Sequence, residues 1–170
     1  DADFAAKLIY GPFAIRPISS AAGKRSEGNV DPSITVQYDV APHVMVYGTW
    51  GRGSKSGGFV SNTLGTTNAT FQFKPERSEN FEAGVKSTML DGKVVANVSL
   101  YHTQFKNLQV SVYQPATSSY LTGNAASATS KGVEGSFTFY PVDNFDINAS
   151  AAYQDIKYDD YPGAACLASQ

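Results

Sequence analysis

The sequence has few charged residues and no long hydrophobic run. Asp, Glu, Lys and Arg make up 16% of its 170 residues, below the roughly one quarter that is usual for soluble domains. Ser, Thr, Asn, Gln, Gly, Ala and Tyr are frequent instead, a mixture that is poor for a packed helical core. It suits a sheet with one face in lipid and the other on a wet lumen. No apolar stretch approaches the roughly 20 residues of a membrane helix, which argues against a helical membrane protein.

Several kinds of chemical site are also missing. Cys166 is the only cysteine, so neither an internal disulfide nor a multi-cysteine metal site is possible within the chain. His43 and His102 are isolated, and two isolated histidines make a poor metal site. The net charge of -2 is scattered along the chain, which gives no nucleic-acid footprint. We find no nucleophile with a neighbouring base. The sequence therefore predicts no enzyme, no catalytic residue, no metal site and no cofactor.

Apolar and polar residues alternate in six segments, as in β-strands with one apolar face. Residues 94–100 are an example, because Val94, Ala96, Val98 and Leu100 share one parity. We expect strands at 33–40, 44–52, 79–89, 93–113, 131–140 and 145–158. Residues 31–158 are thus predicted to form a six-stranded antiparallel segment. Residues 1–30 are predicted to be loop or partial strand, and 159–170 the start of an external loop.

The connections between these strands alternate in length. Residues 41–43, 91–92 and 141–144 form short turns, and Asp91-Gly92 is a strong hairpin signal. Residues 53–77 and 114–129 form long polar loops. Outer-membrane barrels have short periplasmic turns and long external loops, so this alternation favours an up-and-down transmembrane β-barrel. A half-exposed sheet in a soluble protein also alternates and is the competing interpretation.

The polar parity of the strands carries charged and amide side chains. Asn80, Glu82 and Lys86 lie on it in one predicted strand, and Glu134 lies on it in another. In a barrel with a wet interior these residues are predicted to face the lumen, where they pair with one another or with other polar groups.

Four segments, in order, resemble the TonB-dependent outer-membrane receptor family. The matching segments are 46–59 (VYGTWGRGSKSGGF), 73–87 (FKPERSENFEAGVKS), 100–110 (LYHTQFKNLQV) and 124–134 (NAASATSKGVE). In the first of them, Gly53-Ser54 departs from the family pattern, which usually has Gly-Phe there. Each one alone is a weak signal, whereas four in family order are specific.

The resemblance implies a bacterial outer-membrane location and a barrel of about 22 strands filled by a plug domain. It implies active uptake of a scarce nutrient, most often an iron–siderophore chelate, energised by the TonB complex. The chain shows no plug and no TonB box, so we expect a fragment of the C-terminal barrel region. Its partners would be the plug, the TonB complex, outer-membrane lipid and a small-molecule substrate. In the intact receptor Cys166 is either disulfide-bonded or a free thiol.

Aromatic residues in the predicted external loops are candidates for substrate contact, because they can stack on a siderophore or a sugar. They are Phe59, Phe71, Phe73, Tyr113 and Tyr120. Two other functions compete with active transport. One is a passive outer-membrane porin, and the other is a soluble β-sandwich or adhesin that binds carbohydrate through its loops.

Overall fold

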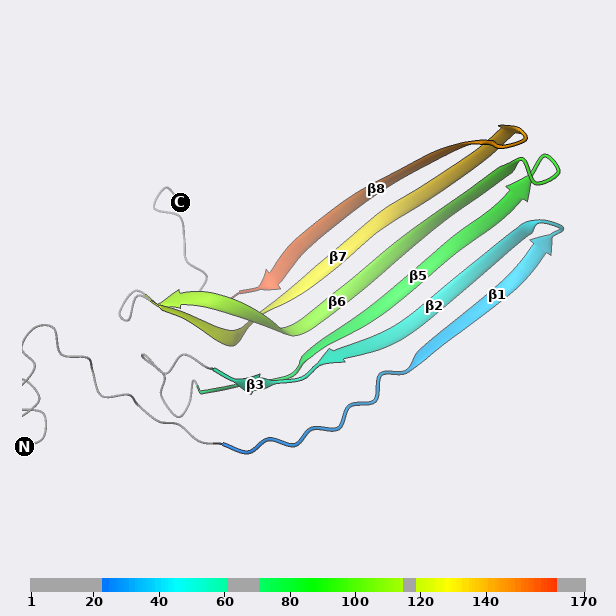
Figure 1. Cartoon of the computed structure of the whole chain (residues 1–170). Helices are drawn as coiled ribbons and strands as arrows, with labels where there is room; N and C mark the ends of the chain where they lie inside the picture. The colour runs from blue at the N-terminus through cyan, green and yellow to red at the C-terminus, as the bar shows by residue number, and fades with distance from the viewer. Residues whose placement is uncertain (1–22, 61–70, 115–118, 162–170) are drawn as a thin grey trace, which may run out of the picture.

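The fold is a single curved layer of antiparallel strands in a computed structural model (Figure 1). The structure describes residues 23–60, 71–114 and 119–161. The strands are β1 (Ser33–Ala41), β2 (Val44–Lys55), β3 (Gly58–Phe59), β4 (Gln72–Phe73), β5 (Glu76–Met89), β6 (Val94–Gln114), β7 (Ser119–Val142) and β8 (Phe145–Asp160). Cys166 and the residues before position 23 lie outside the described residues.

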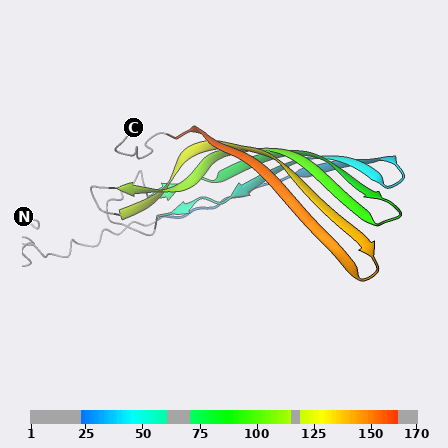
Figure 2. The same cartoon turned by 90° about the horizontal axis from the view of Figure 1, so that it is seen from above.

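Six of the strands form one sheet in the order β1-β2-β5-β6-β7-β8, and β3 pairs with β4 in a small second sheet. Every pairing is antiparallel between strands that follow one another along the large sheet. The view in Figure 2 shows that the large sheet is curved, with the strands at its β8 edge inclined to those at its β1 edge. The predicted all-β, antiparallel, up-and-down architecture is confirmed.

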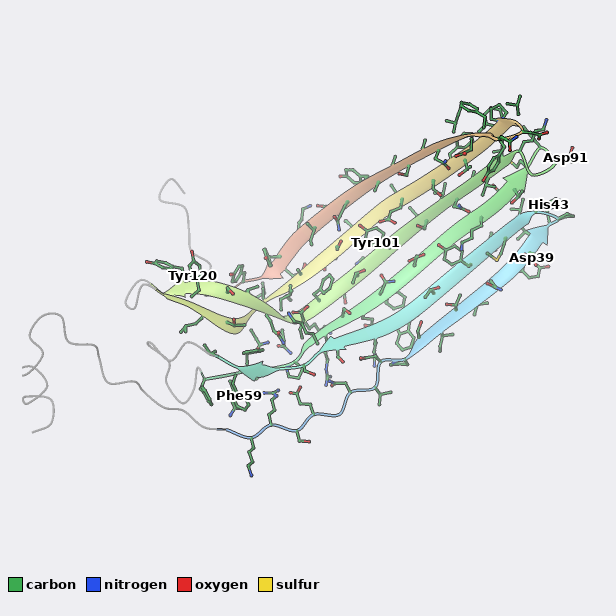
Figure 3. All side chains as sticks on the ribbon, viewed as in Figure 1. Asp39, His43, Phe59, Asp91, Tyr101 and Tyr120 are labelled. Atoms are coloured by element: carbon green, nitrogen blue, oxygen red, sulfur yellow. The ribbon has the colours of Figure 1, made fainter. Side chains whose placement is uncertain are left out.

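Three tight turns close the sheet at one end, where Figure 3 labels His43 and Asp91. Asp91 and Gly92 have φ values of 53° and 87°, and the Lys93 N–H donates to the Leu90 carbonyl at 3.1 Å. Leu90 also has a positive φ of 54°, and the last paired residues are Met89 and Val94. The hairpin loop therefore comprises the four residues 90–93, with Asp91-Gly92 at its centre. His43 and Asn144 hold the left-handed position in the other two turns, with φ values of 73° and 63°.

At the opposite end the strands run further than the sequence pattern predicts. The predicted loop 114–129 is wrong, because β7 begins at Ser119 and pairs with β6 up to Gln114. The predicted loop 53–77 is shortened from both sides, because β2 ends at Lys55 and β5 begins at Glu76. Small polar residues have low strand propensity, but backbone pairing to an already extended neighbour overrides that preference.

The sheet has almost no core. Only a few small or medium side chains are buried among the described residues, and no large side chain is fully buried there. A soluble β-sandwich packs two sheets face to face around a shared core, and the described residues show no such arrangement. In the described part of the chain, β1 and β8 each have one strand neighbour. Among the described residues no helix is long and apolar enough to cross a membrane.

Candidate functional site

One face of the large sheet, here called the apolar face, carries a continuous hydrophobic band. The register aligns Val36, Gly48, Ala83, Leu100, Val133 and Tyr153 across all six strands. Val36 is 69% exposed and Leu100 59% exposed. Contiguous apolar surface on this scale is rare on soluble monomers and marks a surface that another apolar phase covers.

The band ends in a row of mixed character on the side away from the turns. Trp50 and Phe81 lie opposite each other there, and Arg52 and Glu79 lie opposite each other in the next row. The Trp50 indole N–H donates to Glu79 Oε1 at 3.0 Å, and the Arg52 guanidinium pairs with the same oxygen at 3.2 Å. The Arg52 guanidinium also lies 5.2 Å from the centre of the Trp50 ring. An amphipathic aromatic row followed by charges is typical of a membrane interface.

The other face, here called the polar face, is held together by side-chain hydrogen bonds between neighbouring strands. Tyr47 donates to Glu82 Oε1 at 2.6 Å. Other bonds on this face join Thr103 to Asn80 at 2.6 Å, Asn97 to Ser136 at 3.1 Å, and Gln154 to Ser130 at 2.9 Å. Among the described residues that are not exposed, no buried side-chain nitrogen or oxygen lacks a partner. A face with this density of polar contacts suits a wet surface.

All four polar residues that the sequence singles out lie on the polar face. Asn80 and Glu82 accept the hydrogen bonds described above. The Lys86 ammonium lies 5.4 Å from the centre of the Tyr47 ring. Glu134 lines an open hollow of about 440 Å³ together with Tyr47 and Asn97. The structure therefore brings Glu82, Lys86 and Glu134 around one tyrosine, Tyr47.

The five aromatic candidates fall into two clusters at the end opposite the turns, where Figure 3 labels Phe59 and Tyr120. Phe59 and Phe71 have ring centroids 5.1 Å apart. A Cβ atom added to Gly58 would lie 2.7 Å from the Phe73 ring, so Phe73 packs over that glycine. Tyr113 and Tyr120 form the second cluster, with centroids 5.2 Å apart, and are 46% and 66% exposed. β4 contacts β7, so both clusters belong to the same end of the sheet.

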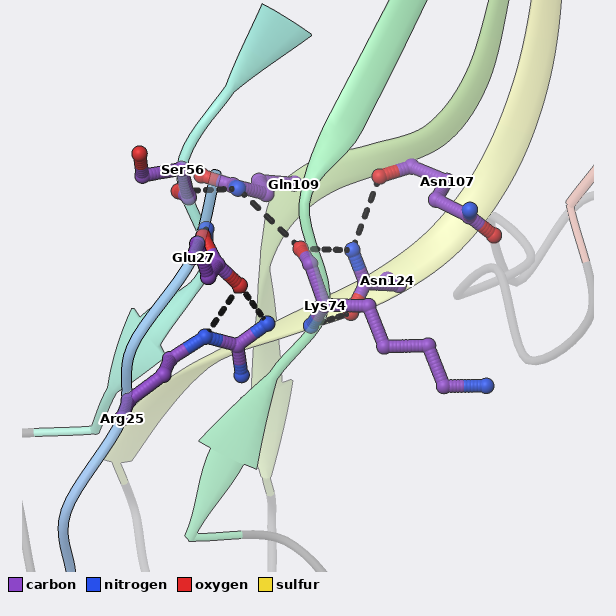
Figure 4. A network of polar contacts seen from close by, with 8 residues as sticks. Arg25, Glu27, Ser56, Lys74, Asn107, Gln109 and Asn124 are labelled. Carbon is purple, nitrogen blue, oxygen red and sulfur yellow. Dashed lines mark hydrogen bonds and ion pairs between the residues drawn. The ribbon is translucent and has the colours of Figure 1, made fainter. Parts of the chain in front are cut away.

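A network of amide side chains joins the strand extensions at this end (Figure 4). The Asn124 Nδ2 donates to the carbonyls of Lys74 and Asn107 at 2.8 Å each, and Asn124 Oδ1 accepts from the Lys74 N–H. Gln109 Nε2 donates to the carbonyls of Ser56 at 2.9 Å and Lys74 at 3.2 Å. Asn107, with a φ of 55°, lies at a register shift between β6 and β7. Two amides thus tie the β6–β7 hairpin to the chain segments that flank β3 and β4.

Because of this network, we expect Asn124→Asp to loosen the end of the sheet opposite the turns. The substitution keeps the acceptor for the Lys74 N–H, but it removes both N–H donors and places a carboxylate against two carbonyl oxygens. We expect local destabilisation of about 1–3 kcal/mol. It is measurable as faster hydrogen exchange at the backbone amides of β4 and of the β6–β7 extension.

Asn97→Asp is the matched control. Asn97 donates to a single hydroxyl, that of Ser136, and a hydroxyl can rotate and donate to the new carboxylate. Exchange rates in the β6–β7 extension should stay at the wild-type values in this variant. Equal rates in wild type and Asn124→Asp would contradict the role assigned to the network.

Comparison with known families decides what kind of sheet this is. A model of the TonB dependent receptor-like β-barrel matches residues 10–165. The chain belongs to this family of TonB-dependent receptors. The family resemblance of the four sequence segments is thereby confirmed. The open six-stranded sheet is a segment of a transmembrane barrel, with the long strand extensions and their amide network at one end.

Several proteins similar to this segment are named as receptors for metal chelates, and one solved neighbour is named a peptide transporter, RagAB. The metal-pseudopaline receptor CntO of Pseudomonas aeruginosa is 28% identical over 153 residues, which is 90% of this chain and 20% of that receptor. The ferric yersiniabactin uptake receptor FyuA from Yersinia pestis superposes with a TM-score of 0.57 at 22% identity, over 76% of this chain and 19% of that one. The ferripyoverdine receptor of the outer membrane of P. aeruginosa gives a TM-score of 0.61 at 19% identity, over 80% and 18%.

These likenesses extend over a small part of each relative. The chain spans about a fifth of the curated receptor that it matches. At these identities the solved structures establish only the fold of the segment. The match to the family model establishes that the segment belongs to the family.

Sequence reasoning missed the residues that join neighbouring strands. Tyr47, Gln109 and Asn124 lie within the quoted segments, yet nothing in the sequence indicates that they bond across strands. That Tyr101 lies opposite Gly132 is known only from the register of the folded sheet. The signal for such residues is an interstrand register, which a single sequence does not contain.

Proposed function

We propose that this segment is part of a bacterial outer-membrane receptor that takes up a metal–siderophore chelate and is energised by TonB. Family membership supports a transport receptor rather than an enzyme. The name of the relative from P. aeruginosa, a metal-pseudopaline receptor, supports a metal chelate as the class of substrate. Two of the solved neighbours are named for yersiniabactin and pyoverdine, which supports the same class, whereas another, RagAB, is named a peptide transporter.

The observation that carries the proposal is a single-layer sheet with two unlike faces and two unlike ends. Its apolar face, with side chains such as Leu100 exposed, suits the lipid side of a barrel wall. Its hydrogen-bonded polar face suits a wet lumen. Short turns at one end and long extensions at the other correspond to the periplasmic and external sides.

On this proposal the polar face contacts the plug domain of the intact receptor. Asn80, Glu82, Lys86 and Glu134 then face the lumen, as the sequence predicts. Glu82 and Lys86 are already oriented by Tyr47, whereas Glu134 borders an open hollow. Glu134 is therefore the carboxylate best placed to accept a hydrogen bond from the plug.

The external aromatic residues are proposed to contact the chelate. Tyr113 and Tyr120 are half-exposed or more, and they lie opposite each other at the outer end of β6 and β7. Tyrosine offers a flat apolar ring together with a hydroxyl, which suits the aromatic or heterocyclic parts of an organic chelator. Phe59 and Phe71 offer a second stacking surface at the same end.

We expect Tyr113→Ala/Tyr120→Ala to weaken chelate binding by about 10-fold, because each aromatic contact contributes roughly 0.5–1.5 kcal/mol beyond its area burial. The measurement is uptake of radiolabelled iron, from a panel of ferric siderophores, by cells in which the intact receptor is the only one present. Tyr140→Ala, an exposed tyrosine near the turn that ends β7, is the control. Its uptake should match that of the wild type.

The same assay tests the energy source. Uptake should stop when TonB is deleted and return when it is restored. Uptake that persists without TonB and does not saturate with chelate would support the passive porin instead. If none of the ferric siderophores in the panel is taken up, the metal–siderophore assignment is contradicted.

A further inference from the structure

Two like charges face each other on the apolar-face side of the sheet, beyond the hydrophobic band. Arg77 on β5 lies directly opposite Lys106 on β6. Both residues are exposed, and both share parity with Phe81 and His102, which lie in the band's last row. Like charges at directly opposite positions destabilise a sheet. In the described part of the chain, neither Arg77 nor Lys106 belongs to an ion pair. Among the described residues, the carboxylate that acts on this pair is Glu79 in the next row, which interacts with Lys106 at a distance longer than an ion pair.

A hollow lies beside this pair and has the composition of an anion site. Its volume is about 340 Å³, and Arg52, Arg77 and Lys106 line it. Its two carboxylates are already engaged, since Glu79 accepts from Arg52 and Trp50 while Asp31 accepts from Ser54 at 2.7 Å. Three cations against two engaged carboxylates leave an excess positive charge. Arginine and lysine side chains together hold phosphate well, the first as a fork and the second as a point charge.

The depth of the hollow places it at the membrane surface. Arg52 lies two residues beyond Trp50 on β2, and Ser54, which pairs with Arg77, lies four residues beyond it. At about 3.3 Å per residue and a tilt of about 40°, these rows lie roughly 5 and 10 Å outside the Trp50 row. The headgroup layer on each side of a bilayer is about 5–8 Å thick. Long basic side chains from these rows reach the phosphates in that layer.

We propose that Arg52, Arg77 and Lys106 form a binding site for the phosphate-bearing headgroup of a membrane lipid. The inference rests on the proposed membrane orientation, in which the apolar face contacts the bilayer at its external side. The lipid phosphate supplies a counter-ion in contact with both Arg77 and Lys106. Bound there, it fixes the depth of the barrel wall below the external extensions of β2 and β5.

The test uses the intact receptor in dodecylmaltoside, titrated with phosphatidic acid and observed by native mass spectrometry. Arg77→Gln/Lys106→Gln should weaken phosphatidic acid binding by about 10- to 30-fold, because each basic residue near an anionic lipid contributes roughly a factor of five. The matched control is Lys131→Gln/Lys157→Gln, which removes the same charge from the same side. Those lysines already have Asp155 as a partner, opposite Lys131 and 3.0 Å from Lys157. Phosphatidic acid binding by this control variant should change less than about twofold.

A second readout separates the ligand site from a merely structural pair. Without phosphatidic acid, Arg77→Gln/Lys106→Gln should be at least as stable to urea as the wild type, since it removes a repulsion. Addition of phosphatidic acid should stabilise the wild type and leave the double variant unchanged. Unchanged lipid binding in that variant would overturn the site. Equal binding of inorganic phosphate and phosphatidic acid would overturn the assignment to a lipid.

Insertion of the receptor into neutral phosphatidylcholine vesicles separates a failure of the proposed membrane orientation from a failure of the lipid site alone. Failure to insert there contradicts the membrane orientation and with it the proposed function. Normal insertion with no preference for anionic phosphatidic acid over phosphatidylcholine, whose phosphate is balanced by choline, contradicts the lipid site alone.

Discussion

Ala151→Arg is expected to prevent stable insertion of the receptor, whereas Ala152→Arg is expected to be tolerated. The two alanines are adjacent on β8 and project from opposite faces. Ala151 lies opposite Gly135 within the apolar band, which on β8 runs from Ile147 to Tyr153, and Ala152 lies opposite Glu134 on the polar face. An arginine on the lipid face near the bilayer midplane costs about 2–4 kcal/mol. An arginine at position 152 instead faces the Glu134 carboxylate and gains a cross-strand partner.

The measurement is the amount of folded receptor in the outer-membrane fraction. Folded barrels resist SDS until they are heated, so the unheated gel mobility reports folding directly. Purified variants refolded into phosphatidylcholine vesicles then give the free energy of unfolding in urea. The pair is closely controlled, because the residue, its replacement and its strand are the same. Equal loss in both variants would indicate an intolerant strand, and equal tolerance would show that the apolar face is not in lipid.

The two faces could be predicted from the sequence because side chains alternate along a strand with a period of two. Val94, Ala96, Val98 and Leu100 were expected to share a face, and the register places them in successive rows of the apolar band. The turns could be predicted as well, since Asp91 and Gly92 adopt the positive φ values that hairpin loops often require. These features depend on local chemistry alone, so a single sequence contains them.

The end of the sheet opposite the turns was not predictable in the same way. Residues 119–129 are mostly small or polar, apart from Tyr120 and Leu121, and the sequence pattern predicts a loop there, yet β7 includes them. They are held by backbone pairing to β6, across the register shifts around Leu108 and beside the left-handed Asn107. Which residues lie opposite one another is a property of the assembled sheet. The network at Asn124 and the like-charge pair of Arg77 and Lys106 follow from that register and from nothing local.

Register also determines how the wall of the barrel is packed, because two tyrosines on the polar face lie over glycines directly opposite them. Tyr47 covers Gly84, and Tyr101, labelled in Figure 3, covers Gly132. A Cβ added to Gly132 would lie 2.7 Å from Tyr101 Oη and would also collide with the backbone oxygen of Tyr153. Glycine in a strand allows such a close approach, and the ring in turn shields the exposed backbone.

Gly132→Ala is therefore expected to destabilise the folded receptor by about 1–3 kcal/mol, the usual cost of overpacking. Gly135→Ala, three residues further along β7, should instead stabilise the folded receptor. A Cβ there meets only the Asn97 carbonyl at 3.7 Å, and alanine is favoured over glycine in a strand by about 0.5–1 kcal/mol. Urea unfolding in phosphatidylcholine vesicles measures both variants. In a Tyr101→Ala background the cost of Gly132→Ala should shrink, leaving the part that comes from the Tyr153 backbone. An unchanged cost in that background would show that the tyrosine does not pack on the glycine.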